Sequence, residues 1–291
     1  MSRVRSSLAA LLFACALLAA ACGGRPRPLL PTAPLRSASL PQLVAAFNRD
    51  ADAVQSLSLK LTLTARAGKH KYPGVGAFLL TRKPSSIRLW GNFTLVGRVF
   101  DMASNGEVFE LNLPTQNRFF VGRNDVVLKK VKSPWENLRP QVILNSLLIN
   151  PVPASQRVAL DPNAPRAEYD VFVLQPGEDG FERLVRRITF SRYDLLPVRQ
   201  VIYDPDGIHT TVATYSKYTL RQGIPIPEDM TISRPVEGYS LRLQIDPKGI
   251  HVNVPFTAPH TFTLTPPRGS TIIELGHLAA GSGEGDKSPR R

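Results

Sequence analysis

The chain has 291 residues, a formal charge of +13 at neutral pH and only two cysteines, Cys15 and Cys22. So few cysteines exclude a small scaffold built on disulfides. The positive charge suits nucleic acid or anionic lipid headgroups, and it is spread over short clusters: Lys69-His70-Lys71, Lys129-Lys130-Val131-Lys132 and Arg186-Arg187. Beyond residue 21, no apolar run reaches the roughly 18 residues expected of a membrane-spanning helix.

The N-terminus has the pattern of an export signal. Arg3 and Arg5 precede an uncharged run, Leu8–Ala21, which is shorter than the about 20 residues needed to cross a bilayer but suits a signal peptide. The run ends at Leu18-Ala19-Ala20-Ala21-Cys22, which resembles the lipobox of bacterial lipoproteins, where the cysteine is acylated and becomes the first mature residue. We predict a signal peptide over residues 1–21 and lipidation of Cys22. Cleavage without acylation is the alternative.

The export signal also bounds the partners and the folded part of the chain. An exported protein rarely meets nucleic acid, so none is expected as a partner. Residues 22–38 contain four prolines and predict an extended spacer after the lipidated cysteine. Residues 279–291 are rich in Gly, Ser and charge and predict a disordered tail. The folded domain is therefore expected over residues 39–278.

Two helices are expected in this domain. The first begins at Ser39, with Gln42 three residues later as in a capping box and Pro41 in the first turn. Its apolar face is expected to comprise Leu43, Val44, Phe47, Ala51 and Val54. The second helix, at residues 138–149, carries Pro140 in its first turn and is apolar around much of its circumference. Such a helix is expected to lie inside the domain.

The remainder of the domain has the pattern of β-strands. Leu57, Leu59, Leu61 and Leu63 alternate with polar residues, which is the two-residue period of a strand with one apolar face. Further strands are predicted at residues 75–82, 86–93, 96–103, 107–113, 118–121, 167–174, 184–191, 197–203, 210–220, 230–234, 241–245 and 256–264. Turn sequences separate them, among them Asp246-Pro247-Lys248-Gly249. Because the connections are short and no βαβ rhythm occurs, the expected fold is mainly β: a single curved antiparallel sheet with the helices on its concave side.

The chain lacks the common catalytic and phosphate-binding motifs. It contains no G-x-S-x-G elbow, no P-loop sequence and no HExxH motif. Its histidines, at positions 70, 209, 251, 260 and 277, are scattered along the chain and indicate neither a metal site nor a catalytic centre. We therefore expect a protein that is not an enzyme and that uses no metal and no cofactor.

Three segments together resemble the LolA/LolB lipoprotein-localisation family. They are residues 76–89, GAFLLTRKPSSIRL, residues 190–215, which include FSRYDLLP and YDPDG, and residues 262–269, FTLTPPRG. The resemblance spans most of residues 40–275 and implies an open β half-barrel whose helices form a lid over an apolar cavity for acyl chains. The lipobox at Cys22 is similar to the LolB-like receptor arm of that family, which implies residence at the periplasmic face of the outer membrane.

The candidate cavity residues are the apolar side chains that strand alternation could turn inward. They are Leu57, Leu59, Leu61, Leu63, Phe78, Leu80, Ile87, Leu89, Phe109, Leu111, Ile188, Phe190 and Ile202. For each residue taken singly, a place in an ordinary sealed core is the alternative. A lipid cavity is a hypothesis about the whole set.

A second candidate site lies at a hairpin tip. Phe93, Leu95 and Val96 fall between two strand patterns, where polar turn residues are usual. The receptor arm of the resembled family presents an apolar residue at the corresponding hairpin, which implies that these three residues touch a membrane. The alternatives are that the two strands run on as one, or that Leu95 folds inward.

These features predict a non-enzymatic lipid or lipoprotein carrier or acceptor, anchored through acylated Cys22. Its expected ligand is a lipoprotein acyl chain or another lipid, and its expected partners are the membrane and a periplasmic carrier protein. Two alternatives remain open. One is a lipid-anchored structural or interaction module of the cell envelope with a sealed core. The other is a sensor of mislocalised lipoproteins or envelope stress built on the same fold.

Overall fold

The computed structural model describes residues 33–126, 138–163, 166–177, 179–204 and 210–275. The described residues from Arg36 onward form one compact unit. The export signal, Cys22 and the tail after residue 275 lie outside the described residues, as do His209, His277 and the basic cluster at residues 129–132. The boundaries expected for the signal, the spacer and the tail therefore remain predictions.

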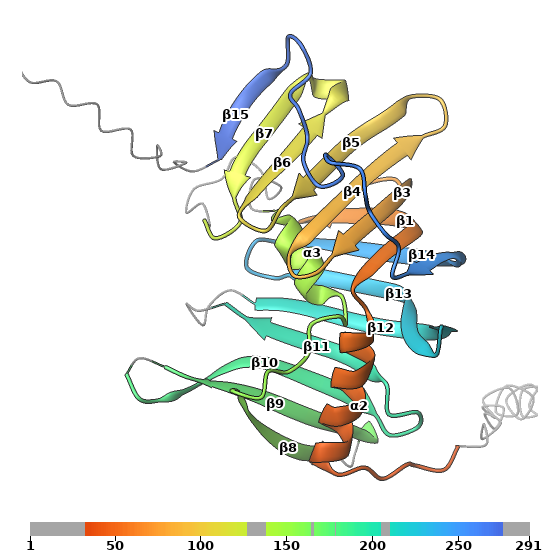
Figure 1. Ribbon diagram of the computed structural model, residues 1–291, viewed down its shortest axis with the longest axis vertical. Coiled ribbons are helices and arrows are strands. Elements are labelled where there is room, and N and C mark those ends of the chain that lie inside the picture. The colour runs from red at the N-terminus through yellow and green to blue at the C-terminus, as the bar shows by residue number, and fades with distance from the viewer. Residues whose placement is uncertain (1–32, 127–137, 164–165, 178, 205–209, 276–291) are drawn as a thin grey trace, which may run out of the picture. The chain divides into compact units, whose positions relative to one another are not determined.

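One open sheet contains the strands of the described residues, and it curls around two helices (Figure 1). The strands are β1 (Ser56–Ala67), β2 (His70–Lys71), β3 (Val75–Arg82), β4 (Ser86–Phe93), β5 (Gly97–Ser104), β6 (Val108–Leu113), β7 (Arg118–Arg123), β8 (Arg157–Asn163), β9 (Glu168–Pro176), β10 (Glu182–Ser191), β11 (Pro197–Tyr203), β12 (Thr210–Arg221), β13 (Ile224–Arg234), β14 (Tyr239–Val252) and β15 (Thr271–Leu275). Their order across the sheet is β15-β7-β6-β5-β4-β3-β1-β14-β13-β12-β11-β10-β9-β8, with β2 beside β1. The expected mainly-β fold is confirmed.

The sheet is mixed rather than wholly antiparallel as expected. Among the described pairings, β15 runs parallel to β7, and the other neighbours are antiparallel. Strand β14 also extends beyond its predicted end at residue 245. Leu59 pairs with Ile250 and Leu61 pairs with Ile245, so residues 246–249 form a bulge within the strand. The sequence Asp-Pro-Lys-Gly therefore marks a bulge where a turn was predicted.

The two helices, α2 (Leu40–Ala53) and α3 (Pro140–Ser146), lie on the inner face of the sheet (Figure 1). The backbone N–H of Ser39 donates to Gln42 Oε1 at 2.8 Å, which confirms the predicted start of the first helix. Helix α3 is shorter than predicted because the backbone leaves the helical conformation at Leu147, where ψ is 139°. No helix among the described residues combines the length and the hydropathy needed to span a bilayer.

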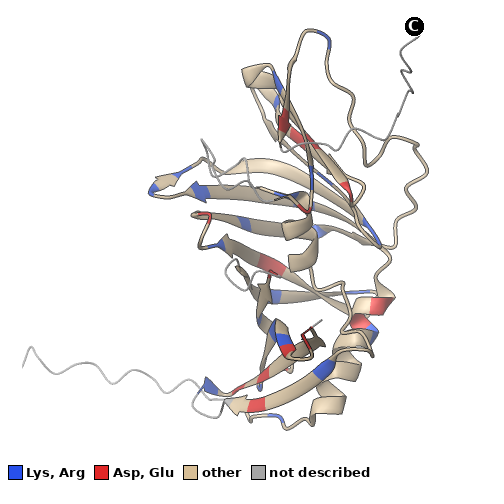
Figure 2. Cartoon of the chain, turned by 90° about the vertical axis from the view of Figure 1, so that its left-hand side faces the viewer, with Lys and Arg blue, Asp and Glu red and all other residues tan. Residues whose placement is uncertain are grey.

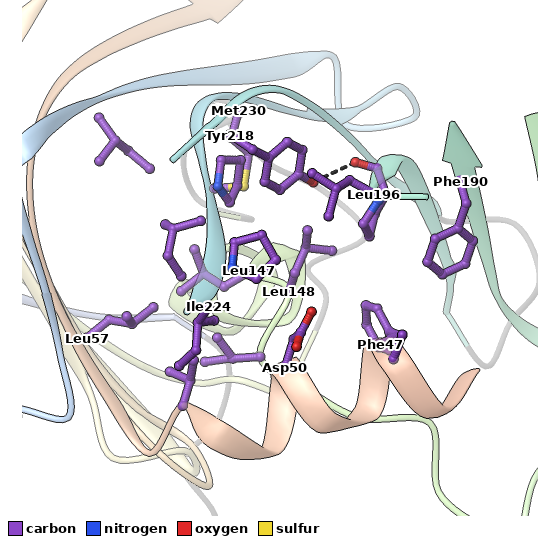
Figure 3. A pocket seen from close by; sticks show the side chains of 18 of the residues that line it. Phe47, Asp50, Leu57, Leu147, Leu148, Phe190, Leu196, Tyr218, Ile224 and Met230 are labelled. Carbon is purple, nitrogen blue, oxygen red and sulfur yellow. Dashed lines mark hydrogen bonds between the residues drawn. The ribbon is translucent and has the colours of Figure 1, made fainter. Parts of the chain in front are cut away.

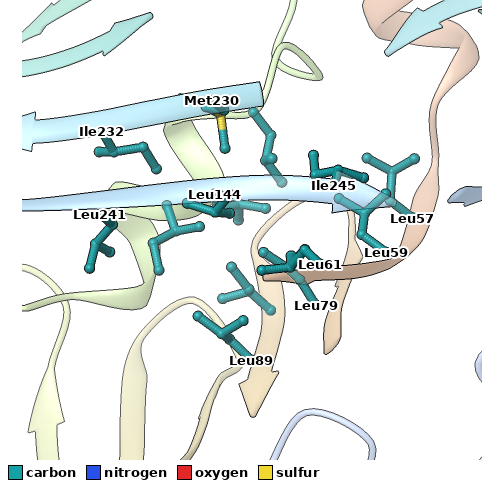
Figure 4. Packing of buried hydrophobic residues seen from close by; sticks show 14 of the residues in the cluster. Leu57, Leu59, Leu61, Leu79, Leu89, Leu144, Met230, Ile232, Leu241 and Ile245 are labelled. Carbon is teal, nitrogen blue, oxygen red and sulfur yellow. The ribbon is translucent and has the colours of Figure 1, made fainter. Parts of the chain in front are cut away.

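The inner face carries the core of the domain. Leu57, Leu59 and Leu61 of β1 pack with Leu79, Leu89 and the apolar side chains of β13 and β14 around Leu144 of α3 (Figure 4). A second cluster joins α2 to β9 and β10, and in it the rings of Phe47 and Phe190 meet edge to face at 6.2 Å. Each fully buried large apolar side chain contributes about 1.5–3 kcal/mol.

The structure corrects the expected orientation of two candidate residues, Phe78 and Leu80. In β3 it is Leu79 that lies opposite Leu59 of β1 and Leu89 of β4, so alternation turns both candidates to the outer face. Phe78 is 37% exposed and stacks on Trp90 at 5.4 Å. Neither residue can therefore face a cavity on the inner face.

Residues 253–270 cross the outer face of β3 to β6 and form no strand, so the strand predicted at residues 256–264 is wrong (Figure 1). Phe262 is buried, and the guanidinium of Arg82 lies 5.1 Å from its ring centre. The N–H of Leu264 donates to the Glu110 carboxylate at 2.7 Å, and burial raises the pKa of Glu110. The segment contains four prolines, and a proline has no backbone N–H to donate to a neighbouring strand. The segment therefore packs through side chains and single hydrogen bonds.

Charged side chains are spread along the strands and connections of the sheet (Figure 2). The two basic clusters among the described residues, Lys69-His70-Lys71 and Arg186-Arg187, lie at different parts of the sheet, at β2 and in β10. This distribution gives no reason to expect a nucleic-acid surface.

The correction at β3 predicts a contrast in stability between neighbouring residues. Leu79→Ala should lower the free energy of unfolding by about 2–5 kcal/mol, because Leu79 is 0% exposed and its removal leaves a cavity. Phe78→Ala should cost clearly less, since that ring lies on the outer face. Denaturant unfolding followed by circular dichroism measures both. An equal or larger loss for Phe78→Ala would contradict the strand register.

Candidate functional site

A cavity of about 300 Å³ lies on the inner face of β14, β1 and β3 to β6, beside α3. Its lining comprises Leu63, Ala65, Tyr72, Pro73, Val75, Leu89, Phe93, Val99, Phe100, Met102, Leu111, Leu113, Gln116, Leu138, Ile143 and Leu241. Apart from Tyr72 and Gln116, these side chains are apolar. The volume is at the lower end of the range of about 300–1,000 Å³ for small-molecule pockets. An apolar ligand fits this chemistry, and a charged one does not.

An irregularity in β5 shapes one wall of this cavity. The pairing of β4 with β5 shifts between Gly91 and Asn92, which leaves Val99 as an extra residue. Such a bulge allows Val99 and Phe100, adjacent in sequence, to line the same cavity. Gly91 makes room for the aromatic ring, because a Cβ there would lie 2.4 Å from Phe100 Cε1.

Three connections at the same end of the sheet border the cavity. The β1–β3 connection contributes Tyr72 and Pro73, and the β6–β7 connection contributes Gln116. Phe93 and Val99 flank the turn between β4 and β5. Alternate connections of an antiparallel meander lie at one end of the sheet. The three connections therefore border one end of the cavity, which is here called its mouth.

The β4–β5 turn carries exposed apolar side chains beside this mouth. Leu95 is 98% exposed and Val96 is 62% exposed, whereas Phe93 is half-buried against the core. The two strands are therefore a hairpin, as predicted, and the alternative of one continuous strand is wrong. Leu95 also does not fold inward to cap the core.

An ion-pair cluster on the outer face braces this hairpin. The buried Asp101 carboxylate accepts from Arg88 of β4 at 2.8 Å and from Arg98 of β5 at 2.6 Å. Both guanidinium groups also lie 5.6 Å from the ring centre of Trp90. A carboxylate shared between two cations forms charge-assisted hydrogen bonds, which are stronger than neutral ones. These bonds hold together the two strands that carry the turn.

A second, smaller hollow of about 50 Å³ lies between α2 and strands β11 to β13 (Figure 3). Phe47 and Asp50 point toward it from α2, and Leu147 and Leu148 close it from the segment after α3. The Tyr218 hydroxyl at its rim donates to the carbonyl of Pro197 at 2.5 Å. A volume of this size holds one or two water molecules at about 30 Å³ each. It cannot hold an acyl chain without movement of its walls.

Residues 145–152, here called the covering segment, run past the smaller hollow. Side chains from the sheet and from α2 bind the backbone of this segment. Tyr215 donates to the carbonyl of Ser146 at 2.7 Å, and Gln200 donates to that of Asn145 at 3.0 Å. Arg186 donates to the carbonyl of Asn150 at 2.9 Å. Asn48 of α2 both donates to and accepts from the backbone of Val152. The covering segment is thus tied to the sheet and to α2 by polar contacts.

The structure divides the candidate cavity residues into five groups. Leu63, Leu89 and Leu111 line the larger cavity, and Leu57, Leu59 and Phe190 line the smaller hollow. Leu61, Ile87, Phe109 and Ile188 are buried without lining either one. Ile202 is half-buried on the inner face, opposite Arg186 in the β10–β11 pair. Phe78 and Leu80 lie on the outer face.

Sequence reasoning missed the cavity residues that come from connections and irregular strands. Tyr72, Pro73 and Gln116 lie in connections, where no period marks an inward side chain. Val99 and Phe100 were missed because the bulge interrupts the alternation. The proline and the aromatic residues at these positions were visible in the sequence, but only the strand pairing brings them to one cavity.

The described residues show no arrangement suited to a metal ion. No group of three or more His, Cys, Asp or Glu side chains in the described parts of the chain is placed to hold one. This finding leaves the expectation that the protein uses no metal as a prediction.

Comparisons with known proteins give only distant likenesses. No protein-family model and no curated protein matches the chain. Among solved structures, a DUF1329 family protein from Desulfovibrio piger matches with a TM-score of 0.47 and 11% identity, over 75% of this chain and 93% of that one. A LolA superfamily protein from Nitrosomonas europaea matches with a TM-score of 0.47 and 10% identity, over 76% and 97%.

A structure described as an outer membrane lipoprotein-sorting protein domain from Vibrio parahaemolyticus matches with a TM-score of 0.44 and 9% identity, over 75% of this chain and 94% of that one. The chain is thus similar in structure, at low identity, to proteins of the LolA superfamily. At these TM-scores and identities, the likeness does not assign the chain to a family, and a LolB-like character stays a prediction.

Proposed function

We propose that the protein is a lipid carrier or acceptor that holds acyl chains in the larger cavity and exchanges them with a membrane. One observation carries this proposal: an apolar cavity of about 300 Å³ has its mouth beside a hairpin whose Leu95 is 98% exposed. A cavity that is only a packing void in the core does not require exposed apolar side chains beside its entrance. The same geometry suits a chain passing from a bilayer into the protein.

The proposed transfer is not enzymatic. An acyl chain gains about 0.8 kcal/mol for each methylene removed from water, so a cavity that covers the chain well draws it from a donor that covers it less well. Such transfer needs no catalytic group. In this proposal the ligands are lipoprotein acyl chains or membrane lipids, and a periplasmic carrier protein is the donor.

The proposal also includes the anchor. Acylation of Cys22 would tether the domain through the proline-rich spacer and keep the hairpin within reach of the lipid surface. The lipobox-like sequence supports this reading, and the absence of Asp after Cys22, where Gly23 and Gly24 follow, supports the periplasmic face of the outer membrane.

A second candidate function is an envelope interaction module with a sealed interior. It is favoured by the four candidate residues that are buried without lining a hollow: Leu61, Ile87, Phe109 and Ile188. Mass spectrometry of lipid that co-purifies after gentle extraction separates the two functions. Bound lipid supports the carrier, and its absence together with no uptake of a fluorescent fatty acid supports the sealed module.

Filling the cavity should weaken acyl-chain binding. Ala65 is half-buried in the cavity wall, and Ala65→Phe would displace about two methylenes at about 0.8 kcal/mol each, which is about tenfold in affinity. Titration with a fluorescent fatty acid measures the effect. Ala45→Phe, at an exposed position of α2, is the matched control and should bind normally. Unchanged binding by folded Ala65→Phe would place the ligand elsewhere.

Changing the hairpin tip should separate delivery from binding. Leu95→Glu should leave the melting temperature and fatty-acid uptake unchanged, since the side chain is almost wholly exposed. It should slow transfer to liposomes, because the shallow insertion of a leucine, worth at most about 1.5–3 kcal/mol, is replaced by a charge. Thr94→Glu adds the same charge one residue earlier, also at an exposed position. Equal rates for Leu95→Glu and Thr94→Glu would remove any special role of Leu95.

Anchoring depends on a single thiol in this proposal. Cys22→Ala should release the protein from the membrane fraction or leave an uncleaved precursor, because no other residue can take the acyl chains. Cys15→Ala, inside the signal sequence, should be processed and acylated normally. Fractionation and intact-mass measurement distinguish the forms. An acylated, membrane-bound Cys22→Ala protein would show that the lipobox reading is wrong.

A further inference from the structure

Two consecutive arginines, Arg186 and Arg187, lie on opposite faces of β10. Residue 186 shares the inner face with Ile188 and Phe190, both buried, and residue 187 shares the outer face with Thr189. The strand period explains the division. One guanidinium is therefore turned toward the apolar side of the sheet, where a charge is costly unless it has partners.

The acceptors of Arg186 are all neutral. Its Nε donates to Gln200 Oε1 at 2.8 Å, its Nη2 donates to the same oxygen at 2.5 Å, and its Nη1 donates to the carbonyl of Asn150 at 2.9 Å. No Asp or Glu among the described residues forms an ion pair with it. Burial lowers the pKa of Arg186 to about 10, so the group keeps its charge at neutral pH. It is a cation on the inner face without an anion.

Arg186 lies against the wall of the smaller hollow. Its guanidinium is 4.9 Å from the ring centre of Phe47, and Phe47 lines that hollow. Its acceptor Asn150 directly follows Ile149, another lining residue. An acyl chain can enter this hollow only if the covering segment moves, and such a movement takes the Asn150 carbonyl away from Arg186.

We propose that Arg186 binds the oxyanion at the head of the lipid, a carboxylate or a phosphate, in place of the Asn150 carbonyl. The ligand class is then an acyl chain with an anionic head, bound at the smaller hollow and not in the larger cavity. This site goes beyond the proposed function, and it rests on the proposal that the protein binds acyl chains. The exchange is favourable because a guanidinium forms stronger, charge-assisted hydrogen bonds with an oxyanion than with a neutral carbonyl. Gln200, which holds the other edge of the guanidinium, keeps Arg186 in place for this bond.

The test compares an anionic and a neutral ligand of the same length. The purified protein is titrated with 11-(dansylamino)undecanoic acid and with its methyl ester. The unchanged protein should bind the acid about tenfold or more tightly than the ester, as expected for one charge-assisted hydrogen bond. Arg186→Gln should bind both equally, and Arg186→Lys should keep part of the preference. Arg187→Gln removes the neighbouring charge on the outer face and should keep the full preference.

The outcomes separate this inference from the proposed function. Equal binding of acid and ester by the unchanged protein overturns the role of Arg186 and leaves the carrier function standing, and this comparison needs no variant to fold. A preference that survives in Arg186→Gln, or is lost in Arg187→Gln, overturns it as well. Binding of neither probe overturns the carrier function and the inference with it. Competition with decanoate and with a monoacyl glycerophosphate then shows whether a carboxylate or a phosphate is preferred, and displacement by neither counts against the proposal.

Discussion

The structure depends on the single apolar face of one long, open sheet. Because β1 alternates strictly, with Leu57, Leu59, Leu61 and Leu63 on one side, it fixes which face of every neighbouring strand must be removed from water. Two helices totalling 21 residues, 14 in α2 and 7 in α3, have to cover that face together with the covering segment. A sheet that curls around so small a cover leaves hollows unless large side chains fill them. The larger cavity lies where the described cover ends, between α3 and the connections of the first strands.

The cover and the sheet beneath it are held by different interactions. The buried leucines of the core each contribute about 1.5–3 kcal/mol, and the strands share continuous ladders. The covering segment is fixed by the buried side chains of Leu147, Ile149 and Val152 and by hydrogen bonds from side chains to its backbone, and each such bond contributes about 0.5–1.5 kcal/mol net. The covering segment lies over the apolar face, so in the proposed function its movement would give a ligand access to that face.

The regular strands could be predicted from the sequence because their period survives in the fold. Strands β3, β4 and β11 have the predicted bounds, and α2 begins at the predicted cap. The orientation of β3 could not be predicted, because Ala77 to Leu80 are all apolar and either pair can point inward. Strand β13 was predicted to begin six residues late, since Pro225 and Pro227 argue against a strand. The pairing of β3 with β1 fixes which side chains of β3 point inward, and the pairing of β13 with β12 fixes where β13 begins.

The site was less predictable than the fold, because it is built from departures from regularity. A bulge at Val99, a glycine under Phe100 and three connections shape the larger cavity, and none of these has a periodic signal. The basic pair Arg186-Arg187 had the pattern of a solvated surface cluster. Alternation in a strand instead divides it between the two faces, which is visible only once the strand and its inner face are known.

The direction of lipid transfer depends on how the free energy of the lipid differs between a bilayer and this protein. The interior of a bilayer is as apolar as a cavity lined by leucine, so moving an acyl chain from one to the other changes the contribution of each methylene very little. Covering more methylenes can favour one carrier protein over another, but it does not decide between the protein and a bilayer. The polar end of the lipid and the displacement of the covering segment make that difference. Arg186 is a cation on the inner face whose acceptors are neutral. In the proposal it forms a charge-assisted hydrogen bond with the lipid head, an interaction that the bilayer interior does not offer. If Arg186 binds the lipid head as proposed, the balance between this protein and a bilayer is set at the head of the lipid.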